Sequence, residues 1–152
     1  MSIEPFFDTK IYIEKGTLIC SFISNGKELT ELRGLLFIKE MTAIMEKIST
    51  IKLNRVVFIF DVDKIVLPYN YELLKSYSEV FKNHKSVIKD KLGFTIIKSE
   101  SNIFRIFIKL FKKFYTPIKP LYLCSTIEES LECIHNEEKL KELISFDIKQ
   151  LK

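Results

Sequence analysis

An uninterrupted apolar stretch in the middle of the chain most strongly constrains how it can fold. Residues 56–60 are Val-Val-Phe-Ile-Phe, with Arg55 before them and Asp61 after them. A strand with one face in water alternates apolar and polar side chains, whereas a strand covered on both faces is apolar throughout. The stretch therefore predicts a central strand of a sheet that carries helices on its faces.

Four shorter segments have the composition of further strands. Phe6 to Ile13 and Thr17 to Ser24 are rich in β-branched and aromatic residues, and residues 14–16 between them predict the turn of a hairpin. Gly93 to Ile97 and Leu121 to Cys124 are the other two strand candidates. Five strands are therefore expected.

A long helix is predicted between the hairpin and the central strand. Apolar residues recur there at spacings near three and four, which is the periodicity of one helix face. Gly34 interrupts this pattern at a cost of about 1 kcal/mol relative to alanine, so it predicts a close contact with another element. The expected apolar stripe is Leu32, Leu35, Leu36, Met41, Ile44, Met45 and Ile48.

Three more helices are predicted from their caps. Asn70 can cap a helix whose apolar stripe ends at Phe81. Ser101-Asn102 is expected to cap a helix from Ile103 to about Tyr115. Residues 125–128 have the spacing of a capping box and predict a helix through Ile134, with an extension toward Leu143.

The expected order of elements is β-β-α-β-α-β-α-β-α. Strands that alternate with helices imply right-handed crossovers and a mostly parallel sheet covered by helices. The 152 residues fit one domain, with a core over about residues 6–145 and no internal repeat or linker. The sequence thus predicts a single α/β domain, residues 1–152.

The basic charge of the chain does not predict a nucleic-acid reader. The formal net charge is +4 and the pI is about 8.8. Lysine supplies 21 of the 24 basic residues, so arginine, the residue that reads guanine with two hydrogen bonds, is scarce. The many Lys, Ile, Phe and Asn residues are typical of an AT-rich genome. We expect no sequence-specific binding of nucleic acid.

The cysteines and the apolar runs indicate an intracellular chain without a metal or cofactor. Cys20, Cys124 and Cys133 are odd in number and include no CxxC pair, which argues against a disulfide framework. Cys20 and Cys124 stand in apolar runs and are expected to be buried, and Cys133 with His135 cannot close a tetrahedral zinc site. No leader-like N-terminus or membrane-spanning run is present, so a cytoplasmic location is expected.

Two stretches, together with the element order, carry a resemblance to a known fold. Residues 60–67, Phe-Asp-Val-Asp-Lys-Ile-Val-Leu, are similar to the segment of the STAS fold in which a strand ends at an aspartate shortly before a helix. Residues 120–131 are similar to its final strand and following helix. STAS domains occur in anti-sigma-factor antagonists and sulfate transporters, so the resemblance implies a non-enzymatic domain that contacts a protein partner. The CRAL-TRIO lipid-binding lobe, of related topology, implies lipid binding as an alternative.

The chain departs from the antagonists where they carry a phosphorylated residue. Their Ser or Thr starts the helix after the aspartate-ending strand, whereas residues 67–71 here are Leu-Pro-Tyr-Asn-Tyr. We therefore expect no phospho-switch at this helix start, where Ser76 and Ser78 are the nearest hydroxyl alternatives to tyrosine. The loop surface that the resemblance assigns to a partner is Lys64, Pro68, Tyr69 and Asn70.

Asp61-Val62-Asp63 allows an enzymatic alternative. It resembles the nucleophile motif of haloacid-dehalogenase phosphatases, in which one carboxylate attacks phosphorus, the other acts as acid and base, and magnesium neutralises the phosphate. Ser99 and Lys112 or Lys113 match further parts of that motif. However, Lys64 and Ile65 replace its small residues, and Cys124-Ser125-Thr126 replaces its metal-binding acidic pair. We favour the simpler interpretation that both aspartates satisfy loop amides, and that His84 and His135 are surface residues.

The helix predicted over Ile103 to Tyr115 has more apolar surface than one packing face needs. Its apolar side chains cover an arc of about 200°, against about 100° for a helix on a sheet. Either it is wedged between the sheet and a neighbour, or its second flank meets a protein partner, a lipid or an anionic membrane surface. The residues of that flank are Phe104, Ile108, Tyr115, Arg105, Lys109, Lys112 and Lys113.

Overall fold

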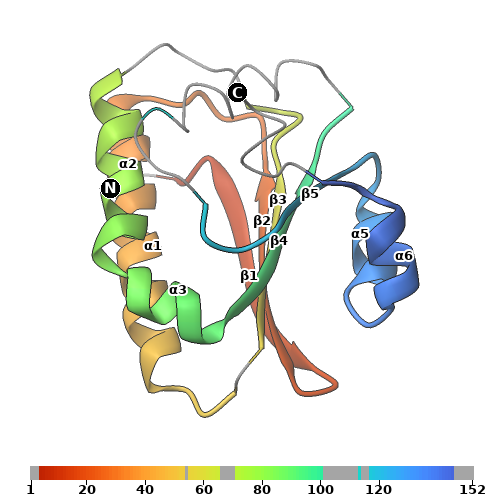
Figure 1. The fold of residues 1–152 in the computed structure, drawn as a ribbon. Coiled ribbons are helices and arrows are strands. Elements are labelled where there is room, and N and C mark those ends of the chain that lie inside the picture. The colour runs from red at the N-terminus through yellow and green to blue at the C-terminus, as the bar shows by residue number, and fades with distance from the viewer. Residues whose placement is uncertain (1–3, 54, 66–70, 101–112, 114–116, 146–152) are drawn as a thin grey trace.

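A six-stranded sheet organises the chain in the computed structural model (Figure 1). The structure describes residues 4–53, 55–65, 71–100, 113 and 117–145. The strands are β1 (Phe7–Glu14), β2 (Thr17–Ser24), β3 (Val56–Asp61), β4 (Leu92–Lys98), β5 (Leu121–Cys124) and β6 (Ile144–Ser145). The helices in the described part of the chain are α1 (Glu31–Thr50), α2 (Tyr71–Asn83), α3 (Lys85–Lys91), α5 (Ile127–Cys133) and α6 (Glu137–Glu142).

The strands stand in the sheet in the order in which they occur in the chain, β1 to β6. β1 and β2 pair antiparallel through Lys15 and Gly16, whose φ values of 49° and 78° are those of a tight two-residue hairpin turn. The β2–β3, β3–β4 and β4–β5 pairs are parallel, and the β5–β6 pair is antiparallel. The sheet is thus mostly parallel, as the sequence predicts.

Helices cover the two faces of the sheet unequally (Figure 1). α1 connects β2 to β3, and α2 with α3 connects β3 to β4, so both crossovers advance in the same direction along the sheet. Right-handed crossovers that advance in one direction place their helices on one face. Accordingly, α1, α2 and α3 lie together on one face, and α5 and α6 lie on the other.

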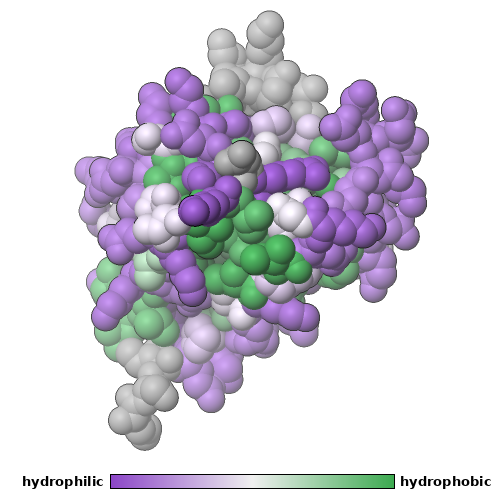
Figure 2. Space-filling model, turned by 90° about the horizontal axis from the view of Figure 1, so that it is seen from below, coloured by the Kyte–Doolittle hydropathy of each residue, from purple (hydrophilic) through white to green (hydrophobic). Residues whose placement is uncertain are grey.

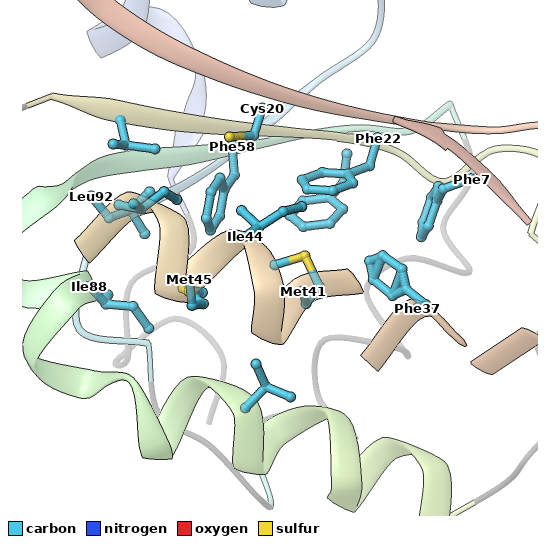
Figure 3. Close-up of a cluster of buried hydrophobic side chains, with 14 of the residues drawn as sticks. Phe7, Cys20, Phe22, Phe37, Met41, Ile44, Met45, Phe58, Ile88 and Leu92 are labelled. Atoms are coloured by element: carbon cyan, nitrogen blue, oxygen red, sulfur yellow. The ribbon is translucent and has the colours of Figure 1, made fainter. Parts of the chain in front are cut away.

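The larger core lies between the sheet and α1, and it is rich in phenylalanine. Phe22 and Phe60 stack with ring centroids 4.7 Å apart, and Phe37 of α1 meets Phe22 edge to face at 5.8 Å. Figure 3 shows Phe22 and Phe58 pointing from the sheet toward Met41 and Ile44 of α1. Because aromatic side chains bury large areas, this cluster supplies much of the driving force that seats α1 on the sheet.

A second core lies on the opposite face and explains the apolar run of β3. Val57 and Ile59 point into this core, whereas Phe58 and Phe60 point into the first one. Alternate side chains of a strand project to opposite faces, so a strand with cores on both sides must be apolar at every position. The side chains that cover this face from α5 and α6 include Cys133, Ile134 and Leu140. The expectation for the central strand is confirmed.

The observed elements differ from the predicted order in three places. α3 was not predicted, and neither was β6. The helix expected to continue from Ile134 toward Leu143 is instead two short helices, because Asn136 caps a new helix by accepting a hydrogen bond from Lys139 N at 3.2 Å. The cap of α5 is Thr126, which accepts from Glu129 N at 3.1 Å, one residue later than predicted. Apart from Lys113, the residues of the helix predicted over 103–115 lie outside the described residues, and so does the Asn70 cap.

The stripe predicted for α1 is wrong at its N-terminal end. Leu32 and Leu35 are 62% and 49% exposed, whereas Phe37, omitted from the stripe, is buried. At 100° per residue, Leu35 lies about 160° around the helix from Phe37, so it faces away from the sheet. The close contact predicted for Gly34 is present, because a Cβ there would collide with the side chain of Leu73 in α2.

No helix in the described ranges combines the length and the apolar character that crossing a bilayer requires.

Candidate functional site

The carboxyl ends of β2, β3 and β4 bring polar side chains to one edge of the sheet. Parallel neighbours end at the same edge, which places Ser24, Asp61 and Lys98 there. The loop after β3 is fastened to both neighbouring strands. Lys64 N donates to Ser24 Oγ at 3.0 Å, and Val62 N donates to Lys98 O at 3.2 Å. The sheet therefore fixes the backbone that presents Asp63.

Asp63 is the centre of this polar cluster. Its Oδ2 forms an ion pair with Lys98 Nζ, and its Oδ1 accepts a hydrogen bond from Glu100 N at 2.9 Å. Asp61 Oδ1 accepts from Asp63 N at 3.1 Å, and Asp61 Oδ2 lies 3.9 Å from Lys98 Nζ. Both carboxylates thus have partners within the chain. We call Asp61, Asp63 and Lys98 the edge cluster.

The surroundings of the edge cluster favour its charged forms. Partial burial acts to raise the pKa of Asp63, but the hydrogen bonds from Lys98 and Glu100 N, with the charge of Lys98, outweigh it and hold the pKa below its usual value. The hydrogen bond to Asp63 raises the pKa of Lys98, although burial opposes the shift. At neutral pH, Asp63 is therefore a carboxylate and Lys98 an ammonium.

This geometry is what the turn interpretation of Asp61 and Asp63 predicts. Each aspartate accepts a hydrogen bond from a backbone amide of the loops, an arrangement in which short acidic side chains stabilise turns. Among the described residues, no group of three or more His, Cys, Asp or Glu is arranged to hold a metal ion. The bonds of the edge cluster join the loop after β3 to the end of β4.

Most of the other predicted site residues are not placed. Lys64 is exposed beside the edge cluster, and Lys113 is exposed in a turn. The remaining loop residues, Pro68, Tyr69 and Asn70, lie outside the described residues, and so do Phe104, Arg105, Ile108, Lys109, Lys112 and Tyr115. The lipid cavity expected beside the helix over 103–115 belongs to that undescribed part as well.

The two histidines are less exposed than expected. Both are half-buried. His84 Nδ1 lies 2.8 Å from Val80 O at the junction of α2 and α3, and His135 Nε2 lies 3.6 Å from Glu14 Oε1. Each ring therefore packs where two elements meet. Ser78, one of the two hydroxyl alternatives for phosphorylation, is fully buried and donates to Lys75 O at 2.6 Å.

The cysteines are buried free thiols. Burial raises the pKa of Cys20 to about 12, and burial with the nearby charge of Glu129 raises the pKa of Cys124 to about 12. A thiol that stays protonated is a poor nucleophile and a poor metal ligand. The expected burial of Cys20 and Cys124 is confirmed, and Cys133 is buried too.

Sequence reasoning missed two parts of this edge. The first is Lys98, although its place at the end of a predicted strand next to the strand of Asp61 was a usable signal. The second is the pair of exposed leucines, Leu32 and Leu35, on the first turns of α1. α1 begins soon after the carboxyl end of β2, so Leu32 and Leu35 lie at the same end of the molecule as the edge cluster.

This end of the molecule thus has a cluster of two carboxylates and one ammonium at the edge of the sheet, and an exposed apolar pair on the first turns of α1. Hydrogen bonds and an ion pair within the chain satisfy the edge cluster, whereas Leu32 and Leu35 expose apolar surface to water. Models of known protein families and sequences of curated proteins were both compared with the chain, and none of them matches it.

Proposed function

We propose that this chain is a non-enzymatic, STAS-like α/β domain that works by binding another protein. The observation that carries the proposal is the edge cluster. The two carboxylates that a phosphatase of the haloacid-dehalogenase type would use are bound to Lys98 and to loop amides of the same chain. Both carboxylates therefore stabilise the loops of the fold.

The electrostatics of Asp63 argue in the same direction. A general acid or base works best when its pKa lies near the working pH. The hydrogen bonds to Asp63 push its pKa away from neutrality, not toward it. Asp63 is therefore poorly suited to give or take a proton during a reaction near pH 7.

On the β2 side of Asp61, the topology also favours a surface over a small-molecule site. Open α/β sheets bind ligands in the crevice where the connections of adjacent strands go to opposite faces. Here the connections that follow β2 and β3 lead to helices on the same face (Figure 1). The sheet opens no such crevice between the ends of these two strands.

The exposed leucines of α1 supply the surface for a protein partner. Leu32 and Leu35 are one helical turn apart, and exposed Glu31 and Lys39 stand on the same helix. Protein interfaces commonly have an apolar centre within a polar rim. Lys64 is also exposed, in the loop after β3 at the same end of the sheet.

The test compares two sets of leucine substitutions. The double variant Leu32→Ser, Leu35→Ser removes the surface, and Leu131→Ser, a 42% exposed leucine of α5 on the other side of the sheet, is the matched control. A partner is isolated with the wild-type chain from cells that express it, purified, and titrated against all three proteins. We expect the double variant to raise Kd at least about tenfold, as loss of a central interface residue does, and the control to leave it unchanged.

Two outcomes would contradict the proposal. One is equal affinity of the double variant and the wild type for every partner isolated. The other is turnover of a generic aryl phosphate with magnesium that Asp61→Asn abolishes, which would establish the enzyme instead.

A further inference from the structure

The outer edge of β1 is long, and no strand in the described part of the chain pairs with it. β1 has eight residues and stands at the end of the sheet, so only β2 pairs with it among the strands that the structure describes. Unpaired N–H and C=O groups along such an edge are a template for another strand. By contrast, the strand at the opposite end, β6, has two described residues.

The hairpin fixes which residues of β1 direct these groups outward. In a two-residue hairpin the residues flanking the turn, Glu14 and Thr17, form a hydrogen-bonded pair, and such pairs alternate along the ladder. Asn25 N donates to Phe6 O at 3.2 Å, which agrees with this alternation at the far end. Even-numbered residues therefore bond to β2, and Thr9, Ile11 and Ile13 direct their backbone groups to the free edge.

Apolar side chains accompany this edge on the α1 face. Ile11 is 43% exposed and Ile13 is 63% exposed. They border a groove of about 350 Å³ between β1 and the C-terminal half of α1, lined also by Leu18, Ile44, Ile48 and Ile51. Figure 2, seen from the side of the β1–β2 turn, shows apolar side chains gathered between polar ones on this side of the molecule.

The charges on β1, together with the hydrogen bonds its residues already make, favour one way for the strand to pair with itself. When β1 pairs antiparallel with a second β1 about a two-fold axis, the residues whose backbone groups point outward lie opposite one another. These residues are all odd-numbered, so the axis passes through a residue position and not between two residues. Centred on Tyr12, the pairing sets Lys10 opposite Glu14 and Ile11 opposite Ile13, each twice. Centred on Ile11 it would oppose Asp8 and Glu14, and centred on Lys10 it would oppose two lysines. Centred on Thr9 it would oppose Asp8 and Lys10, but Asp8 already accepts a hydrogen bond from Asn25 Nδ2 at 3.1 Å, and Ile13 would face Pro5, which has no N–H to donate. Opposite charges stabilise a cross-strand pair and like charges destabilise it.

We propose that a second copy of this chain pairs its β1 antiparallel with the β1 of the first, about a two-fold axis at Tyr12. The two sheets then form one continuous sheet. Ile11 and Ile13 of each copy cover apolar surface beside the groove of the other, on the α1 face. On the opposite face, Lys10 of each copy meets Glu14 of the other. Within one copy, Lys10 Nζ lies 5.1 Å from the centre of the Tyr12 ring. The ammonium of Lys10 is therefore already close to the position of the proposed axis.

A charge exchange tests both the dimer and its register. Sedimentation velocity over a range of protein concentrations at low salt compares four proteins. These are the wild type, Lys10→Glu, Glu14→Lys and the double exchange that carries both substitutions. We expect a wild-type species of twice the 17.9 kDa chain mass, a Kd at least about fivefold higher for each single variant, and recovery in the double exchange. Lys141→Glu, an exposed lysine of α6, makes the same charge change away from the edge and should leave the dimer intact.

A cysteine placed at the axis gives a second, independent readout. In this register Tyr12 opposes itself in a pair without hydrogen bonds, where Cα atoms are about 4.5 Å apart and a disulfide can form. Tyr12→Cys should therefore cross-link to a dimer under mild oxidation, whereas Lys10→Cys should not. Thermal melts of each variant establish that it is folded.

Three results would overturn the proposal. They are a monomer at every concentration, a dimer that the single exchanges do not weaken, and a double exchange that fails to recover. The inference is independent of the leucine surface on α1. Leu32→Ser with Leu35→Ser should leave the dimer unchanged, so failure of one proposal does not carry over to the other.

Discussion

At the scale of single residues, Asp63 shows how the chain uses an acid that looks catalytic in the sequence. Its carboxylate joins the loop after β3 to the end of β4 through Lys98 and the amide of Glu100. The side chain is 21% exposed, so these bonds are only partly screened by water. A hydrogen bond to a charged group contributes about 1.5–3 kcal/mol to stability. The edge cluster is accordingly a structural tie between two adjacent loops.

Replacing this carboxylate should lower stability in a pH-dependent way. We expect Asp63→Asn to reduce the free energy of unfolding at pH 7 by about 1–3 kcal/mol. Because the folded pKa of Asp63 lies below its unfolded value, its contribution is complete above the unfolded pKa and is lost as the pH falls through the folded pKa. Urea unfolding of both proteins at pH 7 and in acid measures this.

The matched control is Asp90→Asn, an exposed aspartate of α3. It should change the free energy of unfolding by less than about 0.5 kcal/mol at either pH, as surface substitutions usually do. A difference between Asp63→Asn and wild type that stays constant into acid would show that the carboxylate charge does not matter.

At the scale of elements, the contact between α1 and α2 depends on one glycine. A Cβ on Gly34 would collide with the side chain of Leu73, which is half-buried. Alanine is better than glycine in a helix by about 1 kcal/mol, whereas overpacking costs about 1–3 kcal/mol. The two effects oppose each other at this position.

A double-mutant cycle separates these effects. We expect Gly34→Ala alone to raise the free energy of unfolding by less than about 0.5 kcal/mol, because the Cδ atoms of Leu73, the end of a flexible side chain, must shift and this offsets part of the gain in helix propensity. In a Leu73→Ala background the clash is gone, so the same substitution should raise it by about 0.5–1 kcal/mol. Denaturant unfolding of the four proteins measures both steps. Equal effects of Gly34→Ala in the two backgrounds would mean that Leu73 moves aside at no cost.

The elements with strong local signals were predictable from the sequence. The hairpin, β3 and the close contact at Gly34 follow from turn residues, an unbroken apolar run and a glycine in a helix. α1 was located, but Leu32 and Leu35 were assigned to its buried stripe because spacings of three and four also fit a helix face that turns away from the sheet. α3 and β6 have seven and two residues, too few for a periodic pattern to show.

The edge cluster was predictable only in part, because it is assembled from three strands. Asp61 and Asp63 stood out as a motif, and a turn role for them could be argued from local chemistry. Lys98 is 37 positions after Asp61 in the chain, so their proximity depends on the pairing of β3 with β4. The unpaired edge of β1 likewise has no sequence signature, since it depends on where the strand stands in the sheet.

At the scale of the whole molecule, the two cores differ in how firmly they hold their helices. α1 has 20 residues and buries a face along its length, whereas α5 and α6 have seven and six residues. Helices that short are not stable alone, so α5 and α6 depend on a few buried contacts such as Ile134 and Leu140. They form the less stable layer.

Hydrogen exchange should reveal this difference. We expect the amides of α5 and α6 to exchange through a local opening of lower free energy than those of α1 and β3. Leu140→Ala should speed exchange in α5 and α6 more than in β3, whereas Met41→Ala in the larger core should speed it throughout. Native-state exchange followed by mass spectrometry measures each segment. Equal opening free energies for α5 and β3 would show one cooperative unit.

The agreement between strand order and chain order has a consequence for how the domain is made. Each described strand pairs with its immediate neighbours in the sequence, but the pairings differ in span: a two-residue turn joins β1 to β2, whereas Leu18 and Val56 of the β2–β3 pair stand 38 positions apart. Contacts between residues close in the chain form sooner than contacts between distant ones, and parallel pairing across a helix is slow. The hairpin can therefore form first, and the parallel strands join it later. The described strands that follow join the sheet on its β2 side. The outer edge of β1 is therefore complete as soon as the hairpin forms, before the rest of the sheet is in place.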